Sequence, residues 1–162
     1  MKVTEKSFPL EESSRLLALS DEVLRELELP QADSLPLAID QAVYEWQKNG
    51  TPPKSAAPDI DADDILYAFG IAWGDAVVKK HGWHWANLTF HELDNWEATA
   101  IVSPDASLMI LLFAHIRACI DGEEEVKIGA ALNVIGSDVI PPLEDKSYTN
   151  LTENIQRIIP RT

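Results

Sequence analysis

The stretch from Asp61 to Phe90 (DADDILYAFGIAWGDAVVKKHGWHWANLTF) decides the expected fold, because its pattern changes from helix to strand at one glycine. Asp61 suits the first position of a helix, where a side-chain oxygen can accept from free backbone N–H groups. Gly82 suits the position after the last helical turn. Apolar residues spaced three or four apart predict one buried helical stripe: Leu66, Phe69, Trp73 and Val77. The stretch therefore predicts a long central helix followed by a strand over residues 83–90.

Two shorter helices are expected before this stretch. The first is predicted to begin near Glu11–Ser14 and to end at Pro30. The second is predicted from Ser34, as N-cap, to Asn49-Gly50, with Pro36 in its first turn and with Ile39, Val43 and Trp46 buried. Residues 51–58 (TPPKSAAP) are expected to form a linker within the domain.

After the central helix, three short apolar segments joined by turns predict an antiparallel meander. They are the segment ending at Phe90, then Trp96–Ser103 and Ser107–Leu112. Short helical patterns follow at 115–120, 123–135 and 151–158; for 123–135 a strand is the competing interpretation, because Val126 and Ile128 also alternate. The expected class is α+β: N-terminal helices and a long central helix packed on a small antiparallel sheet of about three strands, with a C-terminal helix. We expect a single domain over residues 1–162, with a helical part at 1–58, a core at 59–136 and an extension at 137–162.

Charge is the strongest compositional signal. The chain has 27 acidic and 13 basic residues, a formal net charge of -14, and acidic residues are in excess along its whole length. Such a surface repels nucleic acid and anionic membranes and attracts basic macromolecules. With one cysteine, no expected signal peptide and no apolar run of membrane-spanning length, a cytoplasmic location is expected.

Three motifs carry a resemblance to a known family. They are an apolar helix with a Gly-x-x-x-Gly step (Gly70 and Gly74), a Gly-Trp-x-Trp entry into a strand at 82–85, and a Ser-Pro-Asp turn at 103–105. An acidic loop before a last helix completes the pattern. Roughly residues 59–136 resemble a small bacterial domain family of unassigned activity. Its members are similar to proteins encoded beside secreted toxins, including those of type VI secretion. The resemblance implies a cognate immunity protein and supplies no catalytic residues.

Metal sites and nucleophilic catalysis find little support in the sequence. The tetrad Asp59, Asp61, Asp63 and Asp64 lacks the glycine and the final glutamate of a calcium loop, so helix capping is the favoured interpretation. The four histidines are better explained as ordinary polar or packing residues, since Gly82 prevents His81 and His84 from sharing a helix face; a metal site would need His91 or His115 to converge with a carboxylate of another element. Cys119 lies in an apolar segment, which favours a buried, inert thiol. We therefore expect no cofactor, no metal and no catalytic residues, although convergence of histidines and carboxylates in one pocket would favour an enzyme.

Three acidic groups are the candidate contacts with a basic partner. Trp83 and Trp85 point to one strand face and are packing residues if that face is the core. If one of the tryptophans is exposed, a Trp among Glu92, Asp94 and Glu97 has the composition of an interface hot spot for a basic partner. The candidates are Asp63 and Asp64; Glu92, Asp94, Trp96 and Glu97; and Glu123, Glu124 and Glu125. The preferred hypothesis is a cytoplasmic immunity protein that binds and neutralises a basic secreted toxin, with a nuclease as the expected class of toxin. The alternatives are a secretion chaperone or adaptor for a basic effector, and an enzyme of unknown class.

Overall fold

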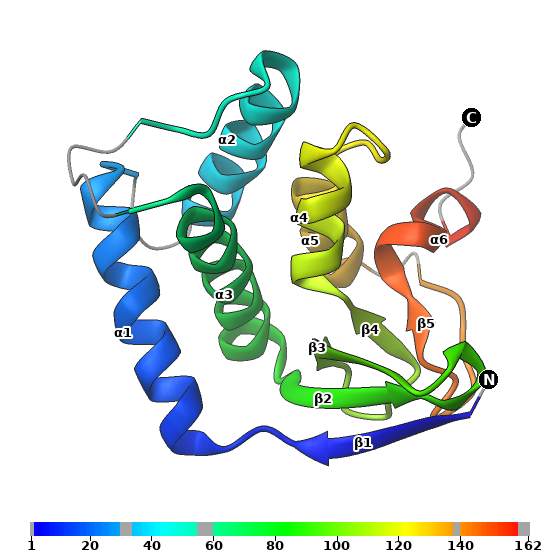
Figure 1. Ribbon diagram of the computed structural model, residues 1–162. Helices are drawn as coiled ribbons and strands as arrows, with labels where there is room; N and C mark the ends of the chain where they lie inside the picture. Colours follow the sequence, from blue (N-terminus) through cyan, green and yellow to red (C-terminus); the bar gives the residue numbers. More distant parts are fainter. Residues whose placement is uncertain (1, 30–33, 55–59, 138–139, 159–162) are drawn as a thin grey trace.

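A strongly curved five-stranded sheet lies against a layer of helices (Figure 1). The computed structural model describes residues 2–29, 34–54, 60–137 and 140–158; for residues 10 and 156–158 it describes the backbone only. The elements in chain order are β1 (Val3–Ser7), α1 (Leu10–Glu26), α2 (Leu35–Asn49), α3 (Ala62–His81), β2 (His84–Phe90), β3 (Trp96–Val102), β4 (Leu108–Ile110), α4 (Leu112–Ile120), α5 (Ile128–Ile135), β5 (Thr149–Asn150) and α6 (Leu151–Ile158). Pro30, Asp59 and residues 55–58 of the expected linker lie outside the described residues.

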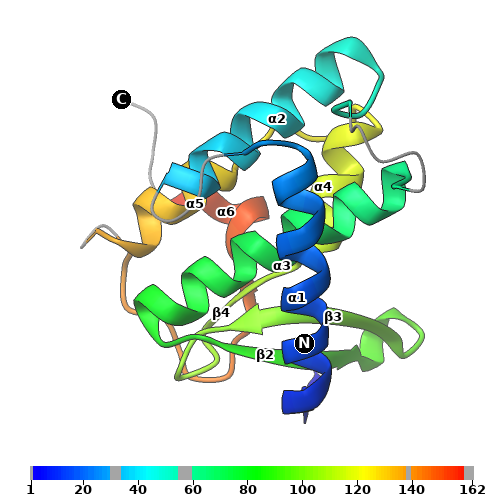
Figure 2. The ribbon, with the colours of Figure 1, turned by 90° about the vertical axis from the view of Figure 1, so that its left-hand side faces the viewer.

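The central helix forms as its sequence predicts. Asp61 and Asp64 make a reciprocal cap, in which the Asp64 N–H donates to Asp61 Oδ1 at 2.9 Å and the Asp61 N–H donates to Asp64 Oδ2 at 3.2 Å. Gly82 follows the last turn with a φ of 72°, a left-handed conformation that favours glycine. Phe69 and Trp73 are fully buried. Figure 2 shows α1 crossing α3, and the Ser20 hydroxyl of α1 donates to the Ala68 carbonyl at 2.8 Å.

Two glycines let neighbouring elements approach α3 closely. A Cβ atom on Gly70 would lie 2.5 Å from the Phe113 ring, and one on Gly74 would lie 2.4 Å from the Trp85 ring. Contacts this short leave no room for a methyl group without displacement of an aromatic side chain. The Gly-x-x-x-Gly step therefore serves as a packing surface for α4 and β2.

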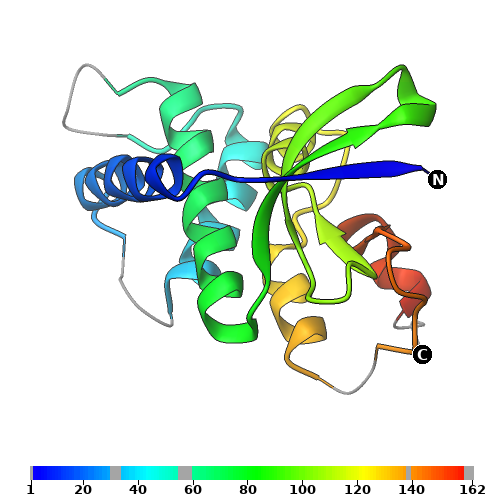
Figure 3. The same ribbon diagram turned by 90° about the horizontal axis from the view of Figure 1, so that it is seen from below.

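The α+β class is confirmed, but the sheet is larger than expected. Strands β2, β3 and β4 form the predicted antiparallel meander. The sequence interpretation missed both outer strands, so the prediction of about three antiparallel strands is wrong in detail. β1 pairs antiparallel with β2 along its whole length, and β5 pairs parallel with β4. In Figure 3, where the molecule is seen from below, β1 passes in front of β2. β1 (VTEKS) has no apolar alternation, and β5 has two residues, so neither gives a recognisable strand pattern.

The curvature brings the two edges of the sheet together. The Tyr148 hydroxyl, directly before β5, donates to Glu5 Oε2 of β1 at 2.7 Å. The face enclosed by this curve has its own small core, which includes Ala86, Leu88 and Phe90. The opposite face contributes Ile101, Leu108 and Ile110 to the main helical core.

Two predicted boundaries in the second half are wrong. Leu112 belongs to α4 and not to the preceding strand. The predicted element over 123–135 is a helix only from Ile128, because residues 121–127 form a connection whose groups bond to α4. Glu123, Glu124 and Glu125 therefore lie in a loop and not at the start of a helix. The predicted helix over 151–158 is confirmed as α6.

Candidate binding cleft

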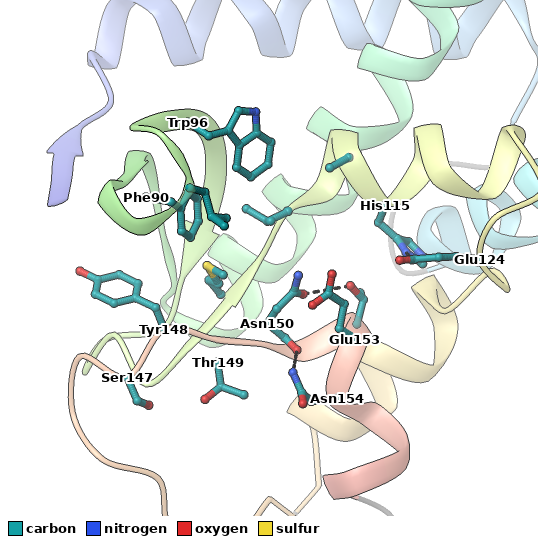
Figure 4. A pocket seen from close by; sticks show the side chains of 15 residues that line it. Phe90, Trp96, His115, Glu124, Ser147, Tyr148, Thr149, Asn150, Glu153 and Asn154 are labelled. Carbon is teal, nitrogen blue, oxygen red and sulfur yellow. Dashed lines mark hydrogen bonds and ion pairs between the residues drawn. The ribbon is translucent and has the colours of Figure 1, made fainter. Parts of the chain in front are cut away.

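A cleft of about 470 Å³ opens between the β2–β3 hairpin, α4 and the segment that forms β5 and the start of α6. In Figure 4, Trp96 and Phe90 lie on one side of it and Asn150, Glu153 and Asn154 on the other. Trp96 is 44% exposed and Leu93, from the same hairpin, is 52% exposed. Both side chains line the same cleft, and exposed apolar side chains that lie together are typical of binding surfaces. We refer to this feature as the cleft.

Trp96 is held at the cleft by its cross-strand neighbour. Phe90 and Trp96 are directly paired in the β2–β3 ladder, and their rings stack with centroids 5.4 Å apart. Phe90 is almost completely buried, so it provides a fixed support for the exposed indole. One face of Trp96 packs on Phe90, which leaves the rest of the ring available to a ligand.

The hairpin turn is fixed by polar contacts. Asp94 and Asn95 both have positive φ angles, 55° and 56°, a conformation that Asp and Asn tolerate well. His91 Nδ1 lies 2.9 Å from Asn95 Oδ1, and Glu92 Oε1 accepts from the Lys2 backbone N–H at 3.3 Å. These contacts fix the turn that presents Leu93 and Trp96, and the Glu92 carboxylate binds the residue that precedes β1.

The opposite wall is rich in hydrogen-bond acceptors. Asn150 Oδ1 accepts from the Thr152 hydroxyl at 3.1 Å, and Asn154 Nδ2 donates to the Asn150 carbonyl at 2.7 Å. The Asn154 side-chain oxygen accepts no hydrogen bond from the described residues. Glu153 is exposed, and its carboxylate makes no hydrogen bond or ion pair with any residue in the described part of the chain.

His115 and Glu124 form the inner end of the cleft. His115 Nε2 accepts from the Lys127 backbone N–H at 3.2 Å, so the proton is on Nδ1, which donates to Glu124 Oε2 at 2.9 Å. Burial lowers the pKa of His115 below its ordinary value, and the bond to Glu124 offsets this only in part. The ring is therefore neutral at pH 7, and it connects α4 to the 121–127 loop.

Cys119, one turn further along α4, is not an activated nucleophile. It is fully buried, and its sulfur lies 3.5 Å from His115 Nε2 and 3.6 Å from the Glu125 carbonyl. Burial raises the pKa of the Cys119 thiol to about 12, with a contribution from the charge of Glu124. The expectation of a buried thiol is confirmed, and no thiolate is available at neutral pH.

The cleft has a negative lining. Of its described lining residues, Glu124 and Glu153 are carboxylates and none is lysine or arginine. Lys127 lies nearby, but its ammonium donates to the Thr152 carbonyl at 3.0 Å. A cationic group entering the cleft would meet acceptors and an aromatic ring.

The other candidate contacts are distributed over the surface. Asp64 caps α3, and Asp63 Oδ1 pairs with Arg117 Nη2 at 2.8 Å. Glu97 follows Trp96 on β3, so strand alternation directs it to the opposite face of the sheet. Glu123 and Glu125 are exposed on the loop that holds Glu124. The structure thus brings Trp96 and Glu124 to one cleft and leaves the remaining acidic residues outside its lining.

Sequence reasoning did not identify Glu153 or the polar cluster at the edges of the sheet. In that cluster, Glu5 binds the His84 imidazole and the Tyr148 hydroxyl. Burial, followed by the bond to Glu5, raises the pKa of Tyr148 to about 12, so the phenol stays protonated. The helical pattern at 151–158 was visible, but no local signal placed it opposite Trp96.

Comparisons with known proteins provide no further assignment. Neither a family model, nor a curated protein, nor a solved structure matches the chain. Within the described ranges, no three His, Cys, Asp or Glu side chains are grouped so that they could hold a metal ion. In the same part of the chain, no helix is long and apolar enough to cross a membrane.

Proposed function

We propose that this protein is a non-catalytic, cytoplasmic immunity protein that binds a basic secreted toxin, such as a nuclease, and blocks it. The observation that carries the proposal is the cleft, where exposed Trp96 and Leu93 stand beside carboxylates and no described lining residue is cationic. Exposed aromatic side chains in such settings are common energetic centres of protein interfaces. The resemblance of residues 59–136 to toxin-neighbouring proteins points in the same direction.

The net charge of the whole protein also favours binding of a basic partner. A net charge of -14 attracts a basic partner from a distance and can raise association rates to about 10⁸–10⁹ M⁻¹s⁻¹ at low salt. Carboxylates would also occupy the cationic groups that a nuclease uses for phosphates. Charge therefore accounts for fast capture, and the aromatic cleft for a specific complex.

An enzyme is the second candidate, because His115 and Glu124 converge in the cleft. The hydrogen bonds of His115 argue against a role as acid or base. Nε2 is occupied by the Lys127 N–H, and the Nδ1 proton is donated to Glu124. A general base needs a free lone pair within reach of the substrate proton, which this ring does not offer.

Co-purification with the basic product of a neighbouring gene tests the immunity proposal. We expect a complex that weakens steadily as salt rises from about 0.05 to 1 M, and protection of cells that express the toxin. Trp96→Ala should weaken the complex at least about tenfold, as loss of an interface hot spot does. Tyr44→Ala is the matched control, because Tyr44 is a similarly exposed aromatic residue (50%) on α2 and lies outside the cleft lining.

The outcomes separate the candidate functions. Failure to form a complex at every ionic strength would contradict the proposal. A complex without protection of the cell would replace immunity by the chaperone or adaptor function. Equal effects of the Trp96 and Tyr44 variants would show that the cleft is not the binding surface.

A further inference from the structure

The chemistry of the cleft can be matched to one kind of side chain. Glu153 brings an exposed carboxylate with no partner among the described residues, and Glu124 Oε1 lies beside the oxygen that binds His115. Asn154 adds a neutral acceptor on the same wall. Groups of this kind bind a donor-rich cation.

The aromatic side of the cleft, formed by Trp96 and Phe90, favours a planar cation. Trp96 stacks on Phe90, and both rings line the same side of the cleft (Figure 4). A guanidinium group is planar and weakly hydrated, and it stacks on aromatic rings while its edge donates to carboxylates. An ammonium group is compact and strongly hydrated, so it gains less from a flat aromatic wall.

The negative lining should also favour binding of an arginine within a peptide over binding of free arginine. Free arginine would carry its own α-carboxylate toward Glu124 and Glu153, and like charges repel. An arginine within a peptide chain has no such charge. Its apolar stem would lie along Leu93 and Leu111, which line the cleft beside Trp96.

We propose that the cleft is a recognition site for one arginine side chain of a protein partner, stacked on Trp96 and paired with Glu153. The inference rests on the proposed function and identifies the group by which the toxin would be held. In this arrangement Trp96 supplies the stacking surface, Glu153 accepts from the guanidinium, and Glu124 adds negative charge at the inner end.

NMR titration of the full chain with a capped tripeptide, acetyl-Gly-Arg-Gly-amide, tests the site directly. The probe signal is the indole N–H of Trp96, assigned by its disappearance in Trp96→Phe. We expect a saturable shift with the arginine peptide and about tenfold weaker binding of the citrulline peptide, which has the same shape without the charge. The lysine peptide and free L-arginine should each bind several-fold more weakly than the arginine peptide.

Two charge-neutralising variants complete the experiment. Glu153→Gln should weaken binding of the arginine peptide about fivefold, since it removes the charge and keeps the shape. Glu11→Gln is the matched control, because Glu11 is an exposed carboxylate in the first turn of α1, as Glu153 is in the first turn of α6, and it lies outside the cleft lining. It should change binding less than about twofold, as expected for a distant screened charge. Unchanged amide spectra of both free variants would establish that they are folded.

Several results would overturn the arginine site: no saturable shift of Trp96, equal binding of the citrulline or lysine peptide, free L-arginine binding as tightly as the capped peptide, or no effect of Glu153→Gln. The proposed function fails separately. If the arginine peptide binds but no complex with the toxin forms, the site stands and the immunity role is lost. If the toxin binds but the arginine peptide does not, the immunity role stands and the site is wrong.

Discussion

The acidic start of α3 and the acidic cleft have similar side chains, but their carboxylates have different surroundings. At the start of α3, Asp61 and Asp64 cap each other's backbone, and Asp63 pairs with Arg117. In the cleft, Glu153 has no partner among the described residues, and it faces an exposed tryptophan. The first group stabilises the fold, while the second is available to a ligand. A count of acidic residues therefore overestimates the charge that can bind a partner.

Glu124 combines the two roles, because it both stabilises the fold and lines the cleft. It lines the cleft, and it also accepts the hydrogen bond that orients His115. The cleft thus contains one carboxylate tied to the interior and one that is free. The two can be distinguished by whether a substitution changes stability, binding or both.

The largest effect on stability is expected for His115→Ala. The substitution leaves a buried cavity beside Trp73 and removes the acceptor for the Lys127 N–H. We expect the free energy of unfolding to fall by about 3 kcal/mol, measured by denaturant titration. A loss of less than about 1 kcal/mol would contradict a structural role for the ring.

The next effect is expected for Asp61→Ala, which removes the N-cap of α3. The Asp64 N–H loses its acceptor, and the cost should be about 1 kcal/mol in the free energy of unfolding. Asp63→Asn is the matched comparison, because it leaves the cap intact and removes only the charge of an exposed carboxylate in the same helical turn, which should cost about 0.5 kcal/mol. Equal losses in thermal denaturation would show that capping does not distinguish these two carboxylates.

A pH dependence of stability follows from the buried imidazole. Because burial lowers the pKa of His115 in the folded protein below its ordinary value of 6.5, the unfolded chain takes up this proton first as the pH falls. The contribution of neutral His115 to the free energy of unfolding is fully present above pH 6.5. It is lost progressively as the pH falls from 6.5 to the pKa of His115 in the folded protein. His115→Gln should therefore show a shallower decline of melting temperature below pH 6.5 than the unmodified protein. Parallel curves would contradict a neutral, buried His115.

The smallest effect on stability is expected for Glu153→Gln, the substitution that should weaken peptide binding. Glu153→Gln should change the free energy of unfolding by about 0.5 kcal/mol or less, because the only contribution expected to be lost is that of a carboxylate in the first turn of α6. Chemical denaturation checks this value beside the binding titration. A loss comparable with that of Asp61→Ala would mean that Glu153 supports the fold and is not free for a ligand.

The sequence by itself determined the elements that depend on local rules. Asp61, the apolar stripe through Trp73 and the stop at Gly82 define α3, because capping and helical periodicity act within a few residues. The meander of β2, β3 and β4 could likewise be predicted from alternation and turns. The burial of Cys119 followed from its apolar neighbours.

Only the tertiary structure decided the sheet edges and the cleft. β1 and β5 are strands because β2 and β4 supply backbone hydrogen bonds to them, and their own side chains carry no strand pattern. Whether a carboxylate is free depends on neighbours that are distant in the chain: Arg117 for Asp63, His115 for Glu124, and no described residue for Glu153. Trp96 and Glu153 face one cleft because the sheet curves until its edges meet at Glu5 and Tyr148. Long-range packing produces that curvature, and a local sequence pattern does not encode it.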